Sequence, residues 1–280
     1  MKILVTGVKG QLGYDVCRQL DARGIENRGV DIEDFDITDR NAVAAYINTY
    51  RPDAIVHCSA FTAVDRAEDE IELCTRVNAD GPKNIAEAAA AIGAKMMYIS
   101  TDYVFPGTGE QHYKPDDETG PLSVYGKTKL MGEEAVRAAS DRHFIVRISW
   151  VFGKNGNNFV KTMLRLAETK TDLNVVCDQI GSPTYTFDLA ILLCDMIVSD
   201  KFGTYHATNE GLCSWAEFAE EIMRQGGKTT KIHPIPTSEY PTRANRPLNS
   251  RMSKDKLVDS GFSRLPDWKD ALSRYLKELD

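Results

Sequence analysis

The opening of the chain joins a short apolar run to three glycines spaced three residues apart. Residues 2–6 are mostly apolar or β-branched and end at Gly7, which is typical of a buried strand. Gly10 and Gly13 follow, and we expect a helix over residues 11–23. Glycines between a strand and a helix let the backbone approach a pyrophosphate at the helix N-terminus. The feature restricts the chain to folds that open on a βα unit and predicts a nucleotide site.

Strands and helices continue to alternate after this turn. The expected strands lie at residues 27–30, 54–58, 95–99 and 144–148, and the expected helices at 41–49, 68–92, 123–139, 158–169, 187–198, 214–225 and 268–279. Pro82 should bend or break the long helix. Such alternation implies a parallel sheet with helices on both faces. We predict an α/β fold with a Rossmann-type doubly wound sheet.

The regular alternation ends near Trp150, which suggests two parts. We predict a dinucleotide-binding domain over residues 1–150. Residues 151–280 should form a smaller, mainly substrate-binding lobe, interleaved with the end of the sheet rather than joined by a linker.

Charge and hydropathy exclude two classes of protein. The formal net charge is −7, whereas nucleic-acid binders present a basic surface to phosphates. No stretch approaches the roughly 18 apolar residues of a membrane helix, and the N-terminal apolar run is too short for a signal peptide. The six cysteines and five histidines show no spacing typical of a metal site. We expect a cytoplasmic protein with no nucleic-acid or membrane partner and no metal.

An acidic residue at the end of the second expected strand indicates the cofactor. Asp31 lies 21 residues after Gly10, where a carboxylate can accept hydrogen bonds from ribose hydroxyls. This favours NADH, although residues 31–39 also fit a solvated acidic loop, and Lys9 and Arg28 leave NADPH open. The residues predicted to bind the cofactor here are Gly7, Gly10, Gln11, Leu12, Gly13, Asp31, Asp36 and Ile37.

A second group of residues indicates redox chemistry at a carbonyl or alcohol carbon. Tyr125 and Lys129 stand four residues apart in an expected helix, so their side chains share one face. A nearby ammonium lowers the pKa of a tyrosine, ordinarily about 10, and Lys129 can also hold the nicotinamide ribose. Thr101 follows an expected strand, and its hydroxyl can donate to a substrate oxygen. The spacing of tyrosine and lysine alone is a weak signal, but with Thr101 it predicts a catalytic triad.

These motifs resemble the extended short-chain dehydrogenase/reductases, and within them the dTDP-4-dehydrorhamnose reductase family. The general resemblance rests on the glycine-rich turn and on residues 100–105 and 125–129. The narrower resemblance rests on residues 51–53, 63–65, 121–129, 147–151, 178–184 and 246–250, and it covers essentially the whole chain. It implies reduction of the C4 keto group of dTDP-4-dehydro-L-rhamnose to dTDP-L-rhamnose, the last step in making that activated sugar.

The resemblance also implies further site residues. Those expected beside the cofactor are Ala60, Phe61 and Thr62, and those expected beside the sugar are Val64, Thr101, Asp102, Tyr103 and Trp150. The substrate also carries a diphosphate, and the cations considered for holding it cluster around Asn158 and around Arg246; Asn158 and Arg246 are themselves predicted to bind the substrate. These cations are Lys154, Lys161, Arg165, Arg243, Arg246 and Arg251. Without the resemblance, Val64, Asp102 and Trp150 would be read as packing or turn residues.

Other functions of the same fold stay open. One is a different nucleotide-sugar reductase, an epimerase or a dehydratase; the other is a non-catalytic regulator that binds NADP, as in the accessory subunit of methionine adenosyltransferase. Dehydratases of this family place Asp-Glu after the threonine, whereas Tyr103 follows Asp102 here, which favours simple reduction.

The family resemblance is the only reason to consider a magnesium site. Some bacterial members of the family form dimers around a magnesium ion, and Asp15, Asp188 and Glu278 are the acidic positions to consider. We expect them to be unrelated surface acids and the protein to be a monomer or a weak homodimer.

Overall fold

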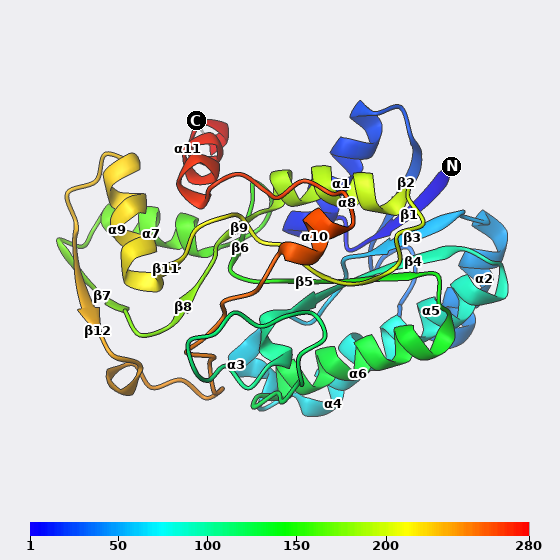
Figure 1. Ribbon diagram of the computed structural model, residues 1–280, viewed down its shortest axis with the longest axis horizontal. Helices are drawn as coiled ribbons and strands as arrows, with labels where there is room; N and C mark the ends of the chain where they lie inside the picture. The colour runs from blue at the N-terminus through cyan, green and yellow to red at the C-terminus, as the bar shows by residue number, and fades with distance from the viewer. Residues whose placement is uncertain (280) are drawn as a thin grey trace.

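A six-stranded parallel sheet forms the centre of the molecule (Figure 1). The structure is a computed structural model and describes residues 1–279. The strands lie in the order β10-β5-β4-β3-β1-β2, with β1 (Lys2–Thr6), β2 (Glu26–Val30), β3 (Ala54–His57), β4 (Lys95–Thr101), β5 (His143–Ile148) and β10 (Gly203–His206). The chain leaves β1 toward β2 on one side and returns to β3 on the other. Ligands of open α/β sheets bind outside the carboxyl ends of the strands at such a reversal.

Helices cover both faces of this sheet (Figure 1). α1 (Gln11–Ala22) and α8 (Thr186–Ile197) pack together on one face, and α2 (Arg40–Tyr50), α5 (Gly81–Ala91) and α6 (Val124–Ala139) cover the other. Successive strand residues point to opposite faces, so Ile3 and Val5 enter one apolar layer and Leu4 enters the other. The predicted α/β doubly wound fold is confirmed.

The expected and observed bounds of the predicted helices and strands differ by at most three residues. Local capping explains two of the helix starts. The Asp39 carboxylate accepts from the N–H of Asn41 at 2.9 Å before α2, and the Ser123 hydroxyl accepts from the N–H of Gly126 at 3.1 Å before α6.

The long helix expected over residues 68–92 contains a π-helical turn. α4 (Ile71–Thr75) passes into η1 (Arg76–Asp80), a π-helix, and then into α5. Pro82 has no N–H, so it cannot donate to the carbonyl of Asn78 one turn earlier. The hydroxyl of Tyr98 donates to that carbonyl instead, at 3.1 Å. The break expected at Pro82 is thus a change of helical register, which brings the Asn78 side chain to the loop after β3.

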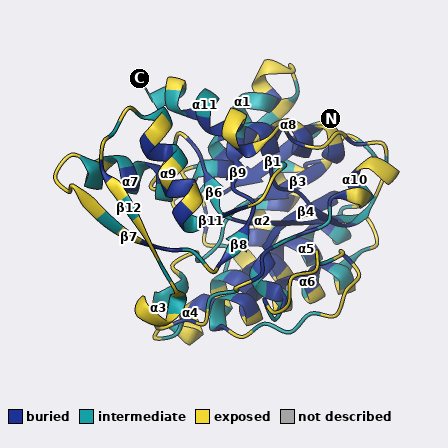
Figure 2. Ribbon diagram, turned by 60° about the vertical axis from the view of Figure 1, so that its left-hand side comes forward, coloured by how far each residue is buried: buried dark blue, intermediate teal, exposed yellow. Residues whose placement is uncertain are grey.

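A second body, which we call the C-terminal lobe, packs beside the carboxyl ends of the strands (Figure 1). Its main elements are α7 (Phe159–Ala167), α9 (Trp215–Gln225), α11 (Trp268–Leu279) and the paired strands β7 (Asp172–Val176) and β12 (Lys231–Ile235). Its shorter elements are β6 (Val151–Phe152), β8 (Ile180–Gly181), β9 (Thr184–Tyr185), β11 (Cys213–Ser214) and η3 (Thr237–Glu239). Three further short helices pack elsewhere: α3 (Val64–Ala67) and η2 (Asp102–Val104) against α6, and α10 (Asp255–Asp259) against β10. Figure 2 shows that buried residues concentrate around the sheet, whereas much of β7 and β12 is exposed.

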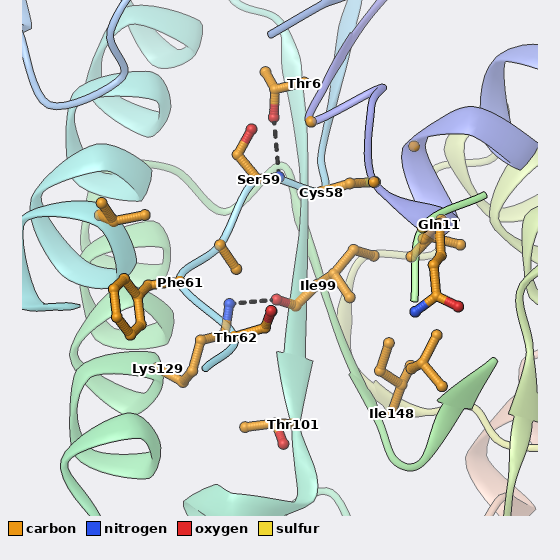
Figure 3. Close-up of a pocket in the computed structure, with 18 of the residues that line it drawn as sticks. Thr6, Gln11, Cys58, Ser59, Phe61, Thr62, Ile99, Thr101, Lys129 and Ile148 are labelled. Carbon is orange, nitrogen blue, oxygen red and sulfur yellow. Dashed lines mark hydrogen bonds between the residues drawn. The ribbon is translucent and has the colours of Figure 1, made fainter. Parts of the chain in front are cut away.

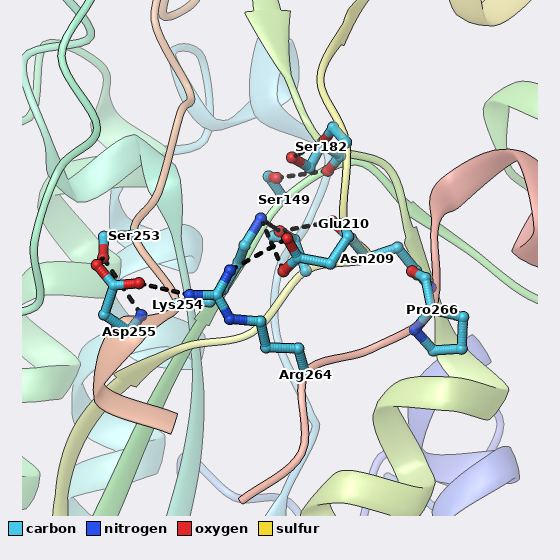
Figure 4. A network of polar contacts seen from close by, with 11 residues as sticks. Ser149, Ser182, Asn209, Glu210, Ser253, Lys254, Asp255, Arg264 and Pro266 are labelled. Atoms are coloured by element: carbon cyan, nitrogen blue, oxygen red, sulfur yellow. Dashed lines mark hydrogen bonds and ion pairs between the residues drawn. The ribbon is translucent and has the colours of Figure 1, made fainter. Parts of the chain in front are cut away.

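Residues after 150 contribute to both bodies, because α8 and β10 return to the sheet. Ion pairs tie this returning segment to the region of α10 (Figure 4). The Glu210 carboxylate lies 3.4 Å from both Lys254 and Arg264, and Arg264 also pairs with Asp255. The domain boundary at residue 150 stays a prediction. None of the helices within residues 1–279 combines the length and apolarity that a membrane span requires.

Candidate active site

A cavity of about 850 Å³ opens at the carboxyl ends of β1, β3 and β4 (Figure 3). A volume of this size accommodates cofactor-sized ligands. The predicted site residues that line it are Gly7, Gly10, Gln11, Leu12, Gly13, Asp31, Asp36, Ile37, Ala60, Phe61, Thr62, Val64, Thr101, Asp102, Tyr103, Tyr125, Lys129 and Trp150. Asn158 and Arg246 are not among the lining residues.

The glycine-rich turn crosses close to the backbone that follows β3. Gly7 has a φ of +72°, and a Cβ there would lie 2.7 Å from the backbone nitrogen of Ser59. A Cβ on Gly13 would lie 2.4 Å from the carbonyl oxygen of Gly7, so neither position accepts a larger residue without backbone movement. α1 begins after Gly10 and has no side-chain N-cap, so its first N–H groups suit an anion such as a pyrophosphate.

Asp31 closes the far end of the same turn. Its carboxylate accepts from the backbone N–H of Lys9 at 2.9 Å. The Lys9 ammonium pairs with Glu33 at 2.5 Å, and the Arg28 guanidinium lies 4.0 Å from Asp34. The two cations considered for an NADPH phosphate are therefore each close to an acidic side chain.

Asn78 fixes the loop of residues 60–62. Its side-chain oxygen accepts from the N–H of Phe61 at 2.8 Å, and its side-chain nitrogen donates to the carbonyl of Phe61 at 3.0 Å. The π-helical turn is what aims Asn78 at this loop, so a local irregularity of the helix holds one wall of the cavity in place.

Lys129 is buried at the middle of the cavity, with 2% of its surface exposed. Its ammonium donates to the carbonyl of Ile99 at 2.7 Å, as Figure 3 shows, and lies 4.0 Å from the centre of the Tyr98 ring. Burial lowers the pKa of Lys129 to about 7, against an opposing effect of Glu133.

Tyr125 precedes Lys129 by one helical turn on α6. The side chain is half-buried, and desolvation of its hydroxyl raises the pKa of Tyr125 above its ordinary value. The nearby Thr101 hydroxyl opposes this rise in pKa. The direction is opposite to the lowering that we predicted from Lys129. The reason is that burial dominates, while the Lys129 ammonium is directed at the carbonyl of Ile99.

Thr101, at the end of β4, belongs to a chain of buried hydrogen bonds. Its hydroxyl donates to the Asp102 carboxylate at 2.8 Å and accepts from the N–H of Tyr103 at 3.2 Å. The Ser250 hydroxyl donates to the other oxygen of Asp102 at 2.5 Å. Burial raises the pKa of Asp102 to about 6, and the bonds from Ser250 and Thr101 act against that rise. Because a hydroxyl carries one proton, Thr101 in this arrangement does not donate into the cavity, whereas we had expected it to donate to a substrate oxygen.

Two tryptophans form the wall on the side of the C-terminal lobe. The rings of Trp150 and Trp215 stack with centres 3.9 Å apart and planes 17° apart. Trp150 has a φ of +51°, a backbone conformation that costs about 1–3 kcal/mol for a non-glycine residue and is concentrated at functional sites. The flat apolar face suits a deoxysugar ring.

Arg246 lies behind the cavity wall rather than on it. Its guanidinium pairs with Asp65 at 2.6 Å and lies 3.4 Å from the Tyr103 hydroxyl, and the Tyr103 ring meets Tyr125 edge-on. Arg246 thus contacts a lining residue.

Asn158 holds neighbouring helices together rather than lining the cavity. Its side-chain oxygen caps α7 by accepting from the N–H of Lys161 at 3.0 Å, and its side-chain nitrogen donates to Gln11 at 3.0 Å and to Tyr275 at 2.9 Å. With these bonds the residue joins α7 and α11 to the start of α1. The geometry therefore does not support the predicted contact of Asn158 with substrate.

The same arrangement of residues recurs in known proteins. The family model described as RmlD substrate binding domain matches residues 1–280. The spore coat polysaccharide biosynthesis protein SpsK of Bacillus subtilis is 44% identical over 99% of this chain and 97% of its own. A crystal structure of a dTDP-4-dehydrorhamnose reductase from Clostridium acetobutylicum matches with a TM-score of 0.98 and 43% identity, and it covers 100% of this chain and 99% of the other. The chain belongs to the dTDP-4-dehydrorhamnose reductase family. Another family member, from Bacillus anthracis and solved in complex with NADP, matches with a TM-score of 0.97, 40% identity, and 99% and 100% coverage of the two chains.

The acidic positions considered for magnesium in this family do not fit an ion here. Arg18 lies 3.1 Å from Asp15 and 2.9 Å from Glu278, and Arg274 binds both oxygens of Asp188 at 2.6 and 2.7 Å. Guanidinium groups thus engage the oxygens that a divalent cation would need. The expectation of unrelated surface acids is wrong, because Asp15 and Asp188 are buried and Arg18 joins Asp15 to Glu278. Within residues 1–279 no cluster of three or more His, Cys, Asp or Glu side chains is arranged to hold a metal.

Sequence reasoning missed three residues that shape this family member's cavity. Asn78 sits inside a helical pattern, Trp215 follows a helix cap, and Ser250 lies in the segment that contributed to the resemblance. The Ser214–Glu217 capping box marks where α9 starts but not that Trp215 turns toward Trp150. No local pattern marks the other two, because their partners lie far away in the sequence.

Proposed function

We propose that this protein reduces the C4 keto group of dTDP-4-dehydro-L-rhamnose to dTDP-L-rhamnose with NADH or NADPH. The observation that carries the proposal is the meeting of Thr101, Tyr125 and Lys129 in the cavity that begins at the glycine-rich turn, in a chain matched over its whole length by this reductase family. The Bacillus anthracis relative, solved with NADP, supports the cofactor class.

The proposal includes a place for each part of the cofactor along the cavity lining. The first turn of α1 would hold the pyrophosphate, Asp31 the adenosine ribose, and Asp36 with Ile37 the adenine. Residues 60–62 would line the path to Tyr125 and Lys129, which would hold the nicotinamide ribose. When bound, the nicotinamide supplies the hydride that reaches the C4 carbon.

Tyr125 would supply the proton. Its raised pKa keeps the phenol protonated at neutral pH, which is the form that donates to an oxygen gaining negative charge. The Lys129 ammonium lies in the same buried region and would stabilise the phenolate left after transfer, because their attraction grows in a site of low dielectric. Thr101 would orient the carbonyl oxygen once its own proton is free to do so.

The substrate would lie between the sheet and the C-terminal lobe. Trp150 would face the apolar side of the sugar, while Val64, Asp102 and Tyr103 would surround its rim. A smaller hollow of about 260 Å³ meets the main cavity at Asn157. Its other lining residues, Lys161, Thr162 and Arg165, offer two cations and a hydroxyl to a diphosphate.

The setting of the enzyme is part of the proposal. A biosynthetic reductase that uses NADH or NADPH works where these cofactors are made, so we place it in the cytoplasm. We propose a monomer or a weak homodimer that needs neither a membrane nor a nucleic-acid partner, in line with the net charge of −7.

A panel assay tests the proposal. Purified protein is mixed with NADH or NADPH and with several 4-keto nucleotide sugars, and the absorbance of the reduced nicotinamide is followed. We expect oxidation with dTDP-4-dehydro-L-rhamnose and formation of dTDP-L-rhamnose. An epimerase would interconvert sugars without net oxidation of the cofactor, and a regulatory subunit would bind the cofactor without converting any sugar. Either result would overturn the proposal.

A further inference from the structure

Ser250 reaches the catalytic end of the cavity from a distant part of the chain. It lies in residues 246–252, which we call the strap. The strap is fixed on both sides, since the N–H of Asn249 donates to Gly107 at 2.9 Å and the N–H of Ser250 donates to Ile180 at 2.8 Å. Ser250 is 3% exposed, and its hydroxyl is held against the Asp102 carboxylate.

The Thr101 hydroxyl has two possible acceptors, the Asp102 carboxylate and a substrate carbonyl, and the protonation of Asp102 determines which one it meets. If Asp102 is a carboxylate, the single proton of Thr101 points to it, as the structure shows. If Asp102 is protonated, its own O–H can donate to Thr101. The Thr101 proton is then free to turn toward a carbonyl oxygen held beside Tyr125.

We infer that Ser250 is a positioning residue, which acts through Asp102 to decide whether the Thr101 hydroxyl donates to the carboxylate or to the substrate. The inference rests on the proposed reduction, in which a second donor beside Tyr125 polarises the carbonyl. Ser250 donates to the oxygen of Asp102 that Thr101 does not contact, and it therefore favours the ionised carboxylate.

The groups that face Asp102 determine in which direction its pKa moves when the Ser250 hydroxyl is lost. Burial raises the pKa of Asp102 to about 6, and the Ser250 hydrogen bond holds it down. The ionisable side chains facing it are Tyr103 from the same turn and Tyr125 from α6, and Arg246 of the strap lies behind Tyr103. Loss of the Ser250 hydroxyl removes a donor to the carboxylate, so the pKa of Asp102 rises.

A carboxyl titration tests this link without any substrate. The ¹³C-labelled carboxyl signal of Asp102 is followed by NMR in the folded protein, and it is assigned by its loss in Asp102→Asn. We expect a midpoint near pH 6 in the parent protein and a midpoint about one pH unit higher in Ser250→Ala, the effect of losing one hydrogen bond to a charged group. Ser253→Ala is the matched control, because the Ser253 hydroxyl bonds Asp255. It should leave the midpoint unchanged.

The pH dependence of kcat/KM tests the step from Asp102 to Thr101. Reduction should fall as pH rises through the Asp102 midpoint, the fall should move upward by the same amount in Ser250→Ala, and it should vanish in Asp102→Asn. An unmoved NMR midpoint in Ser250→Ala would overturn the inference. So would a moved midpoint with an unmoved pH profile. If no sugar is reduced, the proposed function fails while the NMR result still decides the action of Ser250 on Asp102.

Discussion

At the scale of single residues, Tyr125 is the proton donor that we propose, and its surroundings set its protonation. Its ordinary pKa is about 10, and burial raises it further, so the phenol holds its proton throughout the neutral range. Lys129 has its pKa lowered to about 7 by the same burial, so its charge is the one that varies near neutrality. A protonated phenol beside a buried lysine is suited to giving a proton to a carbonyl during reduction.

Replacing Tyr125 by Phe should reduce turnover by at least about a hundredfold, the usual contribution of a general acid. Cofactor affinity should change little, because the ring and Lys129 stay in place. Steady-state rates and fluorescence titration with NADH measure the two effects separately. Turnover retained in Tyr125→Phe would refute the role of the phenol.

Lys129→Met should weaken both turnover and cofactor binding, because Lys129 is proposed both to stabilise the phenolate and to hold the nicotinamide ribose.

Cofactor choice should depend on the acidic partner of Lys9. Glu33→Gln frees the Lys9 ammonium to meet the 2′-phosphate, while Asp31 still serves the ribose of NADH. We expect NADH to serve at least as well as NADPH in the parent protein. The ratio of affinities should shift toward NADPH by roughly two- to fivefold in the variant, because an exposed ion pair is weak.

Glu87→Gln is the control for this change, since Glu87 pairs with Arg40 on the outside of α2 and α5. Calorimetric titration with 2′-phospho-ADP-ribose and ADP-ribose gives the ratio without turnover. An equal shift in both variants would mean that only net charge matters.

At the scale of elements, the placement of α6 against the sheet is fixed by a buried ion pair. Glu133 lies one turn after Lys129, and both of its oxygens accept from Arg147 of β5 at 2.8 Å. Glu133 and Arg147 are 0% and 1% exposed. The pair sets the position of Lys129 relative to the end of β4, and the charge of Glu133 helps keep Lys129 protonated.

Removing one partner of this ion pair should destabilise the fold. Glu133→Gln leaves the Arg147 guanidinium buried beside a neutral amide, so the free energy of unfolding should fall by about 3–5 kcal/mol. Denaturant titration measures it. Glu134→Gln, on the exposed side of the same helix, should stay within about 0.5 kcal/mol. Equal free energies of unfolding in the two variants would show that the buried ion pair contributes no more to stability than an exposed carboxylate does.

The elements also show what sequence could and could not foresee. Periodicity was enough for α1, α6 and five of the six strands of the central sheet, because that signal is local. The edge strand β10 and the short strands of the C-terminal lobe were not placed. The π turn at η1 was not foreseeable, since it depends on Tyr98 taking the carbonyl that Pro82 leaves free. In the site, the glycine spacing and the Tyr125–Lys129 pair were visible. The direction of the Thr101 proton was not, because it depends on Ser250 about 150 residues away.

At the scale of the whole molecule, the sheet supplies the cofactor side of the cavity and the C-terminal lobe supplies Trp215 and the strap. The residues on both sides of the cavity come from one chain. Arg18 and Arg274 engage the acids Asp15, Glu278 and Asp188. We therefore predict a monomer or weak dimer whose rate is the same with and without EDTA. Sedimentation velocity and steady-state rates check this, and a stable dimer that dissociates or loses activity on chelation would contradict it.

The most direct test of the account follows the hydride itself. The protein is incubated with dTDP-4-dehydro-L-rhamnose and NADH or NADPH that carries deuterium on either face of the nicotinamide C4. Proton NMR and mass spectrometry then locate the label in the product. We predict that one of the two labelled faces delivers a single deuterium to C4 of dTDP-L-rhamnose, with one cofactor oxidised per sugar, and that Tyr125→Phe slows this transfer by at least about a hundredfold. A product without deuterium from either face, or conversion of the sugar without oxidation of the cofactor, would contradict the account.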